Sequence, residues 1–193
     1  MISSPSGGGK TTVVTRLLRA MPRLVRSVSV TTRPRRAGER QGSHYHFVSP
    51  AAFQRLRRAG QLLEWAKVHG AYYGTPKRAT LQAMARGRSA ILSIDVQGAR
   101  QIRRALGRRA TLIFLLPPSR GQLRQRLIKR RTETPASIRR RLEAATRELA
   151  CARWYDYTVV NDRLEDAVAQ VEAIVRARSG MVPRRARGTR GGS

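Results

Sequence analysis

Two apolar patterns alternate along the chain. Some short runs are almost continuously apolar, whereas longer segments carry apolar residues every three or four positions. The first pattern is typical of strands buried on both faces, and the second is typical of helices that cover a core. Ser49-Pro50 and Thr75-Pro76 have the cap-then-proline form of a helix start. The expected strands are residues 27–32, 45–48, 62–68, 71–74, 90–95, 110–116 and 157–160. The expected helices are residues 10–20, 50–60, 76–86, 97–106, 119–130, 134–149 and 164–175.

This alternation predicts an α/β fold in which a parallel sheet is flanked by helices. Residues 33–75 break the rhythm with short strands and a charged loop punctuated by Pro and Gly, so we expect an inserted small mixed-β lobe there. The core then consists of residues 1–32 and 76–180, with a helical lid at about 126–140. Residues 181–193 form a basic tail that we expect to be disordered.

The candidate chemistry begins at a glycine-rich stretch before the first expected helix. It ends in Gly9-Lys10-Thr11, as a phosphate-binding P-loop does. Small residues let backbone N–H groups turn inward around an anion, Lys10 would reach the β- and γ-phosphates, and the Thr11 hydroxyl would bind Mg²⁺. The expected ATP-binding residues of this loop are Ser4, Pro5, Ser6, Gly7, Gly8, Gly9, Lys10, Thr11 and Thr12.

The strand that leads into this loop is short, because only Met1, Ile2 and Ser3 precede it. Most of the buried first strand expected before a P-loop is missing from the sequence. We therefore expect the loop to be less rigidly placed than its chemistry requires.

Charge and composition limit the classes of protein to which this chain can belong. The 193 residues carry a formal net charge of +29, and all but four of the 40 Lys and Arg residues are arginines. Such a surface attracts anionic substrates and nucleic-acid backbones. Because the arginines are spread along the chain, we favour a general arginine bias, and nucleic acid stays open as a non-specific partner. The single cysteine, Cys151, excludes an intramolecular disulfide. No stretch has the form of a signal peptide or membrane span, so we expect a cytoplasmic protein without a membrane partner.

Two further groups of side chains suit phosphoryl transfer, which needs positive charge and in-line positioning more than covalent catalysis. One group lies in the inserted lobe and combines guanidinium forks with phenol hydroxyls, which suits an acceptor phosphate. The other lies on the two helices of the expected lid, which can close over the donor phosphates. The lobe group is Arg33, Arg36, Tyr45 and Tyr73, and the lid group is Arg126, Arg130 and Arg141.

In these residues and their spacing the chain resembles the guanylate kinases, a family of P-loop nucleoside monophosphate kinases. The resemblance covers roughly residues 2–178, and the runs 31–39 and 72–75 are much more specific than the P-loop. The chain departs from the family pattern at three positions: Ser4 replaces the first P-loop glycine, Ser93 an acidic residue and Arg131 a glycine. The motifs that carry the resemblance are residues 5–12, 29–39, 42–48, 63–66, 72–75, 94–98, 117–119, 126–127, 130, 132–134, 141–142 and 160–162.

The resemblance implies an enzyme that moves a phosphoryl group from ATP to GMP, with Mg²⁺ as cofactor and dGMP as a second acceptor. Lys10 and the three lid arginines would be catalytic, and Asn161 would complete the ATP site. Asp95 would act on Mg²⁺, directly or through water, or would order the acceptor site.

The same resemblance implies a GMP site in the inserted lobe. Glu64 would accept hydrogen bonds from guanine N1–H and the 2-amino group, a pairing that adenine cannot make. Ser29 and Thr75 would donate to the purine edge. The residues implied for GMP binding are Ser29, Arg33, Arg36, Glu39, Tyr45, Glu64, Tyr73, Thr75 and Asp95, with the first two arginines and both tyrosines on the phosphate.

Three other functions stay open on the sequence alone. The chain could be a binding module that keeps the fold without catalysis, a nucleic-acid-binding protein, or a kinase of another small phosphorylated acceptor. The sequence contains both Gly9-Lys10-Thr11 and the lid arginines, which favours an active kinase. Glu64, Tyr73 and Thr75 favour guanine as the base.

Overall fold

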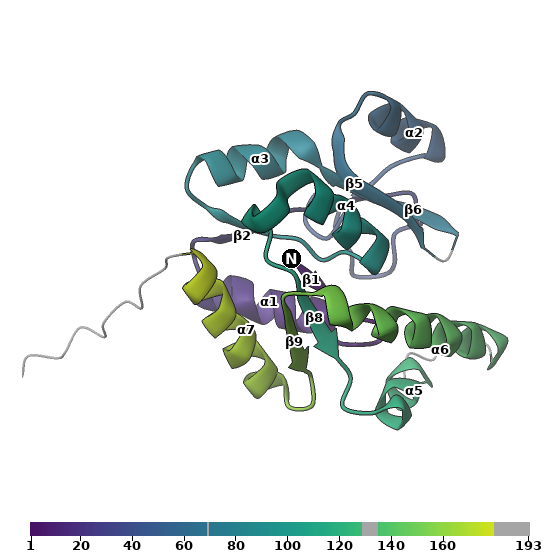
Figure 1. Cartoon of the computed structure of the whole chain (residues 1–193). Coiled ribbons are helices and arrows are strands. Elements are labelled where there is room, and N and C mark those ends of the chain that lie inside the picture. Colours follow the sequence, from purple (N-terminus) through teal and green to yellow (C-terminus); the bar gives the residue numbers. More distant parts are fainter. Residues whose placement is uncertain (69, 129–134, 180–193) are drawn as a thin grey trace, which may run out of the picture.

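The computed structural model describes residues 1–68, 70–128 and 135–179. It is an α/β structure with a central set of parallel strands, helices packed around them and a second small sheet to one side (Figure 1), which confirms the predicted fold class. No helix in the described ranges is long and apolar enough to cross a membrane. The strands are β1 (Ile2–Ser3), β2 (Leu24–Arg26), β3 (Val30–Thr31), β4 (His46–Phe47), β5 (Leu62–Val68), β6 (Ala71–Pro76), β7 (Ser89–Ile91), β8 (Ile113–Leu116) and β9 (Tyr157–Val160). The helices are α1 (Lys10–Ala20), α2 (Pro50–Arg58), α3 (Lys77–Ala85), α4 (Val96–Leu106), η1 (Gly107–Arg109), α5 (Arg120–Ile128), α6 (Pro135–Leu149), η2 (Ala150–Trp154) and α7 (Leu164–Ser179).

The short strand β1 joins the two parts of the core sheet. On one side it pairs in parallel with β8, which pairs with β9, and β2 pairs in parallel with β7. An isolated bridge between Ile2 and Ser93 connects the two parts. Ile2 donates its N–H to the Leu92 carbonyl at 2.8 Å and accepts from the Ile94 N–H at 3.3 Å. Although β1 has only two residues, both are buried and the strand is hydrogen-bonded on both edges.

Each face of this core sheet carries its own apolar core. On one face α1 and α7 pack on the strands, where Leu17 and Val171 are fully buried against Ile113. On the other face α4 covers the strands, and its Ile102 is buried beside Phe114. Helices therefore cover both faces, as the alternating apolar pattern predicts.

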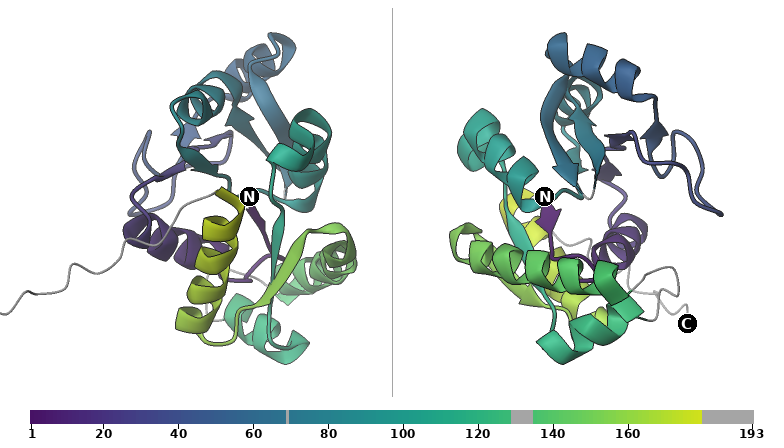
Figure 2. Two further views of the ribbon diagram at one scale, coloured as in Figure 1. Left: turned by 60° about the vertical axis from the view of Figure 1, so that its left-hand side comes forward. Right: turned by 90° about the vertical axis from the view of Figure 1, so that its right-hand side faces the viewer.

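The inserted lobe is built on a four-stranded mixed sheet of order β4-β3-β6-β5. β3 runs parallel to β4 and antiparallel to β6, and β5 and β6 form an antiparallel pair in which Glu64 lies opposite Thr75. Helix α2 packs Phe53 on the sheet, with its ring centroid 5.3 Å from that of Tyr72. In Figures 1 and 2 the lobe (blue) and the helices α6 and α7 (green and yellow) lie on opposite sides of the chain start. The lobe sheet includes Val30–Thr31, which lies before the predicted boundary at residue 33.

Helix starts show where local sequence signals hold and where tertiary contacts override them. The Ser49 hydroxyl accepts the Ala52 N–H at 3.2 Å, so the predicted cap of α2 is confirmed. The expected cap by Thr75 is wrong, because α3 has no side-chain cap and the Thr75 hydroxyl donates to Glu64 instead. Asp95 caps α4 by accepting the Gly98 N–H at 2.9 Å. Strand β2 was not predicted from the sequence, and of the strand expected at residues 27–32 only Val30–Thr31 is a strand in the structure.

Candidate active site

The P-loop connects the end of β1 to the start of α1. Gly7 and Gly9 have φ angles of 89° and 85°, a left-handed conformation that favours glycine. A Cβ on Gly9 would also lie 2.2 Å from Asn161 Nδ2. Asn161 donates that amide to the Gly8 carbonyl at 2.8 Å, which fixes the loop from the end of β9. These contacts turn the loop around the N-terminal end of α1, where anions bind.

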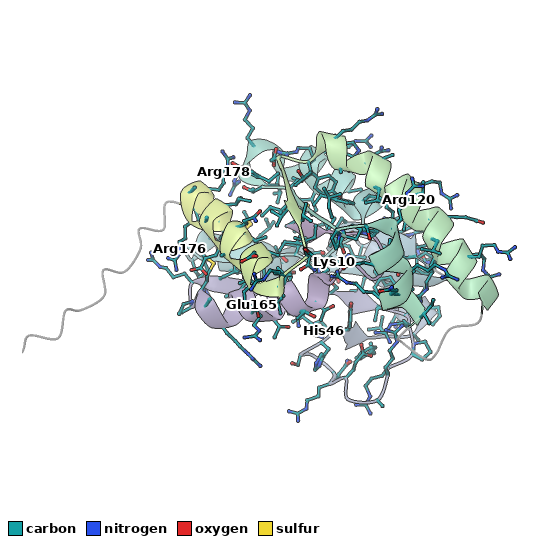
Figure 3. The ribbon with its side chains drawn as sticks, turned by 90° about the horizontal axis from the view of Figure 1, so that it is seen from below. Lys10, His46, Arg120, Glu165, Arg176 and Arg178 are labelled. Carbon is teal, nitrogen blue, oxygen red and sulfur yellow. The ribbon has the colours of Figure 1, made fainter. Side chains whose placement is uncertain are left out.

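Lys10 is the first residue of α1 and lies near the centre of the molecule, whereas Arg176 and Arg178 lie at its edge on α7 (Figure 3). Its Nζ donates to the Ile94 carbonyl at 3.2 Å. Burial lowers the pKa of the Lys10 ammonium, and the nearby Glu148 and Asp95 carboxylates oppose that shift. The amine therefore lies beside backbone carbonyl and carboxylate oxygens at the base of the P-loop.

Of the three lid arginines, Arg141 contacts the P-loop directly and Arg126 contacts it through Asn161. Arg141 of α6 places Nη1 3.4 Å from the Ser6 hydroxyl. Arg126 of α5 donates to the Asn161 carbonyl at 3.0 Å, so it contacts the residue that holds Gly8. The third, Arg130, lies outside the described residues.

The lobe presents a second cationic and aromatic surface to the same space. Arg33 lies 5.5 Å from the ring centroid of Tyr45, and the Tyr45 and Tyr73 rings make an edge contact with centroids 6.0 Å apart. Glu39 pairs with Arg33 through two hydrogen bonds of 3.0 and 2.7 Å, and it also accepts the Arg36 N–H at 2.8 Å. Because of this pairing the pKa of the Glu39 carboxyl is lowered and that of the Arg33 guanidinium is raised. Glu39 thus fixes the orientation of the Arg33 guanidinium through these two hydrogen bonds.

Glu64 is the most buried carboxylate of the site, with a residue exposure of 3%. The Thr75 hydroxyl donates to its Oε1 at 2.6 Å across the β5–β6 pair. Burial raises the pKa of Glu64 to about 7, although the Thr75 hydrogen bond acts in the opposite direction. The carboxylate lies against the first turn of α4, where a Cβ on Gly98 would be only 2.2 Å from Oε2. The missing side chain at Gly98 makes room for it.

One cavity of about 360 Å³ brings the P-loop and the lobe surface together. Four of the predicted site residues that the structure describes do not line it. Thr75 contacts Glu64, Glu39 contacts Arg33, Asn161 contacts Gly8 of the P-loop, and Arg126 contacts Asn161. The predicted residues that line the cavity are Ser4, Pro5, Ser6, Gly7, Gly8, Gly9, Lys10, Thr11, Thr12, Ser29, Arg33, Arg36, Tyr45, Glu64, Tyr73, Asp95 and Arg141.

The cavity also contains residues for which sequence reasoning assigned no role. Ser93, Ile94 and Glu148 of α6 line it, and the Ile94 carbonyl accepts the hydrogen bond from Lys10. Glu148 follows Arg141 by seven residues, so two helical turns place both on one side of α6. That spacing was the available sequence signal for Glu148.

A P-loop and a separate anion-binding lobe that share one cavity define a P-loop nucleoside-phosphate-binding α/β protein. Comparison with known proteins narrows this class. The family model described as guanylate kinase matches residues 1–178. The chain is 50% identical over 173 residues to the guanylate kinase of Nitratidesulfovibrio vulgaris, covering 90% of this chain and 83% of that protein. It is 47% identical to the guanylate kinase of Rhizobium etli, covering 92% and 80% of the two chains.

A solved structure agrees with these sequence matches. The crystal structure of guanylate kinase from Anaplasma phagocytophilum superposes with a TM-score of 0.78 at 35% identity, covering 92% of this chain and 84% of that chain. The chain belongs to the guanylate kinase family. The family resemblance found in the sequence is thereby confirmed.

Proposed function

We propose that this protein transfers the γ-phosphoryl group of ATP to GMP and releases ADP and GDP. The observation that carries this proposal is the single cavity with a P-loop at one end and the buried Glu64–Thr75 pair at the other. Such a cavity can bind a triphosphate and a nucleoside monophosphate with their phosphates facing each other. Membership of the guanylate kinase family supports the same reaction.

The donor end would bind ATP through the P-loop. Its backbone N–H groups and Lys10 would contact the β- and γ-phosphates, while Asn161 keeps Gly8 in place. The Thr11 hydroxyl lies in the first turn of α1, and Asp95 lines the same cavity. These hard oxygen donors fit Mg²⁺, which Thr11 would hold directly and Asp95 through water. Bound Mg²⁺ would neutralise charge on the phosphate oxygens.

The acceptor phosphate would lie against the lobe. Arg33, Arg36, Tyr45 and Tyr73 all line the cavity on that side and supply guanidinium and hydroxyl donors. Glu39 would act through Arg33, because its two hydrogen bonds hold the guanidinium fork in one orientation. Removal of Glu39 should therefore weaken GMP binding without removing a direct contact.

Guanine would be selected by Glu64. An ionised Glu64 accepts two hydrogen bonds, which suits the N1–H and 2-amino donors of guanine, and Thr75 already holds one carboxylate oxygen. Adenine presents an acceptor at N1, so it would leave the buried carboxylate unpaired. Ser29 lies in the cavity and would donate to the purine edge, and Asp95 would order this end through the first turn of α4.

The lid arginines would stabilise the charge that moves between the two nucleotides. Arg141 contacts the P-loop at the Ser6 hydroxyl, and Arg126 is connected to the loop through the Asn161 carbonyl. Arg130 would join them as a third cation. Guanidinium groups placed around a transferring phosphoryl group lower the barrier electrostatically.

A coupled assay that follows ADP production with GMP, dGMP, AMP and UMP as acceptors tests the proposal. We expect turnover with GMP and dGMP only, and a loss of about 10²–10³-fold in kcat for Lys10→Ala, because the phosphate charge loses its fixed partner. Lys77→Ala, at the exposed start of α3, is the matched control and should retain activity. Equal rates with AMP or UMP, or full activity of Lys10→Ala, would contradict the proposal. The cytoplasmic location and any nucleic-acid association stay predictions of the sequence.

A further inference from the structure

Strand β5, which carries Glu64, is the edge strand of the lobe sheet. In the part of the chain that the structure describes, its strand partner is β6, and the register of that pair shifts between Leu62 and Glu64. The pairing is therefore irregular directly before Glu64. Thr75 restrains one carboxylate oxygen, but the position of the strand also depends on what holds its outer edge.

A side chain of α4 holds this outer edge. The Gln101 amide nitrogen donates to the Trp65 carbonyl at 2.6 Å, and the Gln101 amide oxygen accepts the Trp65 N–H at 3.1 Å. One side chain thus pairs with both backbone groups of one residue, as a neighbouring strand would. Because Trp65 directly follows Glu64, this pairing fixes the backbone beside the carboxylate.

Helix α4 is itself anchored in the core of the protein. Its Ala99 and Ile102 have exposures of 0% and 1%. Gln101 lies three residues after Gly98, so both residues lie on the same side of the helix. On that side a Cβ at Gly98 would be 2.2 Å from Glu64 Oε2. The helix therefore connects the core to the strand of the lobe that carries Glu64.

Resting on the proposed function, we propose that Gln101 is a positioning residue for guanine recognition, which holds β5 against α4 so that Glu64 can accept from both guanine donors. Gln101 does not line the active-site cavity, so it acts through β5 and not on the substrate. Hydrogen bonds weaken steeply when their distance or angle departs from the normal range, so two bonds to one carboxylate require a fixed orientation. A single bond to guanine N1–H tolerates a shifted strand better than the pair does.

The test compares GMP with IMP, whose base lacks the 2-amino group, as acceptors for wild type and Gln101→Met. Met keeps the length, the approximate volume and the helix preference of Gln, and it removes both hydrogen bonds to Trp65. Wild type should prefer GMP over IMP in kcat/KM by about 10–100-fold, the effect of one hydrogen bond to a charged group. Gln101→Met should lower this preference by about tenfold through a higher KM for GMP, with kcat and KM for ATP within about twofold of wild type.

A second variant, Gln101→Asn, keeps the test decisive if Gln101→Met does not fold. It carries the same amide on a side chain that is one CH₂ group shorter, so it cannot keep both bonds to Trp65 unless α4 and β5 move closer. We expect its preference for GMP over IMP to fall by about threefold, less than in Gln101→Met.

Two control variants separate positioning from stability. Ser49→Ala removes the N-cap of α2, which packs on the same lobe sheet, and it should lower Tm while the preference for GMP stays as in wild type. Gln82→Met makes the same exchange of residue types at an exposed position of α3 outside the cavity, and it should match wild type in Tm and kinetics. Thermal melts of all five proteins show how much stability each variant loses.

An unchanged GMP/IMP preference in Gln101→Met or in Gln101→Asn would overturn the positioning role, as would an equal fall of the preference in Ser49→Ala. Titration calorimetry with GMP and IMP measures the same ratio without turnover. If wild type binds GMP but makes no GDP, the proposed function fails, and the ratio of the two affinities still decides the role of Gln101. If wild type does not bind GMP, both proposals fail.

Discussion

At the scale of single residues, the position of Glu64 favours guanine recognition but reduces the stability of the folded protein. Recognition of guanine needs a carboxylate, and recognition by two hydrogen bonds needs it to be ionised. Burial at 3% exposure raises its pKa to about 7, from an ordinary value of 4.5. The folded protein therefore holds a proton on Glu64 more readily than the unfolded chain does. The contribution of this group to stability is complete below pH 4.5 and is lost as the pH rises through 7.

Glu64→Gln should consequently make the protein more stable and less active. Its amide oxygen can still accept the Thr75 hydroxyl, but no charge is buried, so at pH 8 the free energy of unfolding should rise by about 2 kcal/mol. The gain should vanish at about pH 4, below 4.5, where Glu64 is protonated in both the folded and the unfolded state. Urea unfolding at the two pH values measures this difference. If the stability of the variant relative to wild type is the same at pH 8 as at this lower pH, burial of the Glu64 charge does not reduce the stability of the wild-type protein.

The same titration predicts how GMP binding depends on pH. Because the protonated carboxyl cannot accept from both guanine donors, the apparent affinity for GMP should fall by up to about tenfold per pH unit below 7. The phosphate of GMP also titrates near pH 6. Glu64→Gln serves as the reference, since it keeps the phosphate effect and lacks the carboxyl. Identical pH profiles of KM for GMP in both proteins would contradict the prediction.

At the scale of secondary-structure elements, α4 positions the base-binding end of the site. Asp95 caps its first turn, and Gly98 in that turn leaves room for Glu64 Oε2. The same helix holds β5 from the side, where the Gln101 amide donates to the Trp65 carbonyl at 2.6 Å and its oxygen accepts the Trp65 N–H at 3.1 Å. One helix therefore aligns both the strand that carries Glu64 and the space around its carboxylate.

Gly98→Ala should raise KM for GMP by about tenfold or more while leaving KM for ATP nearly unchanged, because its Cβ would lie 2.2 Å from Glu64 Oε2 and displace the carboxylate. Helix propensity alone would have the opposite effect on stability, since Ala is favoured over Gly by up to about 1 kcal/mol. Gly121→Ala, in the first turn of α5, is the matched control, because its Cβ meets only Ser119 Oγ at 3.7 Å. Steady-state kinetics with each nucleotide varied in turn measures both variants. Equal KM values for GMP in the two variants would refute the packing argument.

At the scale of the whole molecule, a cavity lies at each end of the core sheet. At the P-loop end of the core sheet the side chains converge on the active site. At the other end a second cavity of about 250 Å³ lies between the sheet, α3, α4 and α7, with Met1, Ala90, Ile102 and Ile113 in its lining. Voids of this kind reduce stability, because the side chains around them lose dispersion contacts.

Ala90→Val should fill part of this second cavity and stabilise the protein by about 1 kcal/mol, through apolar burial and the strand preference of a β-branched residue. The corresponding rise in Tm is about 2–4 °C for a chain of this size. Ala85→Val, exposed near the end of α3, should give no gain. Thermal unfolding monitored by circular dichroism compares the three proteins. A lower Tm for Ala90→Val would mean that the lining cannot accept two more methyl groups.

Much of the fold follows from local pattern. β5 and β9 were predicted with the bounds that the structure has, and so was α1, because strand-forming residue types and helical apolar spacing are local signals. The boundary of the lobe was less well predicted, since Val30–Thr31 joins the lobe sheet only by pairing with Gly74 and Tyr73. The spacing of apolar residues along the sequence does not indicate which strands pair.

The sequence by itself determined the P-loop, the cationic and aromatic residues of the lobe and the family to which the chain belongs, because each depends on residue type at short spacing. Only the tertiary structure decided which atoms meet. It directed the Thr75 hydroxyl to Glu64 rather than to α3, placed Asp95 at the cap of α4, and brought Glu148 into the cavity that Lys10 lines. The physical reason is that burial and hydrogen bonding between distant segments depend on how layers pack, and a chain read residue by residue does not contain those distances.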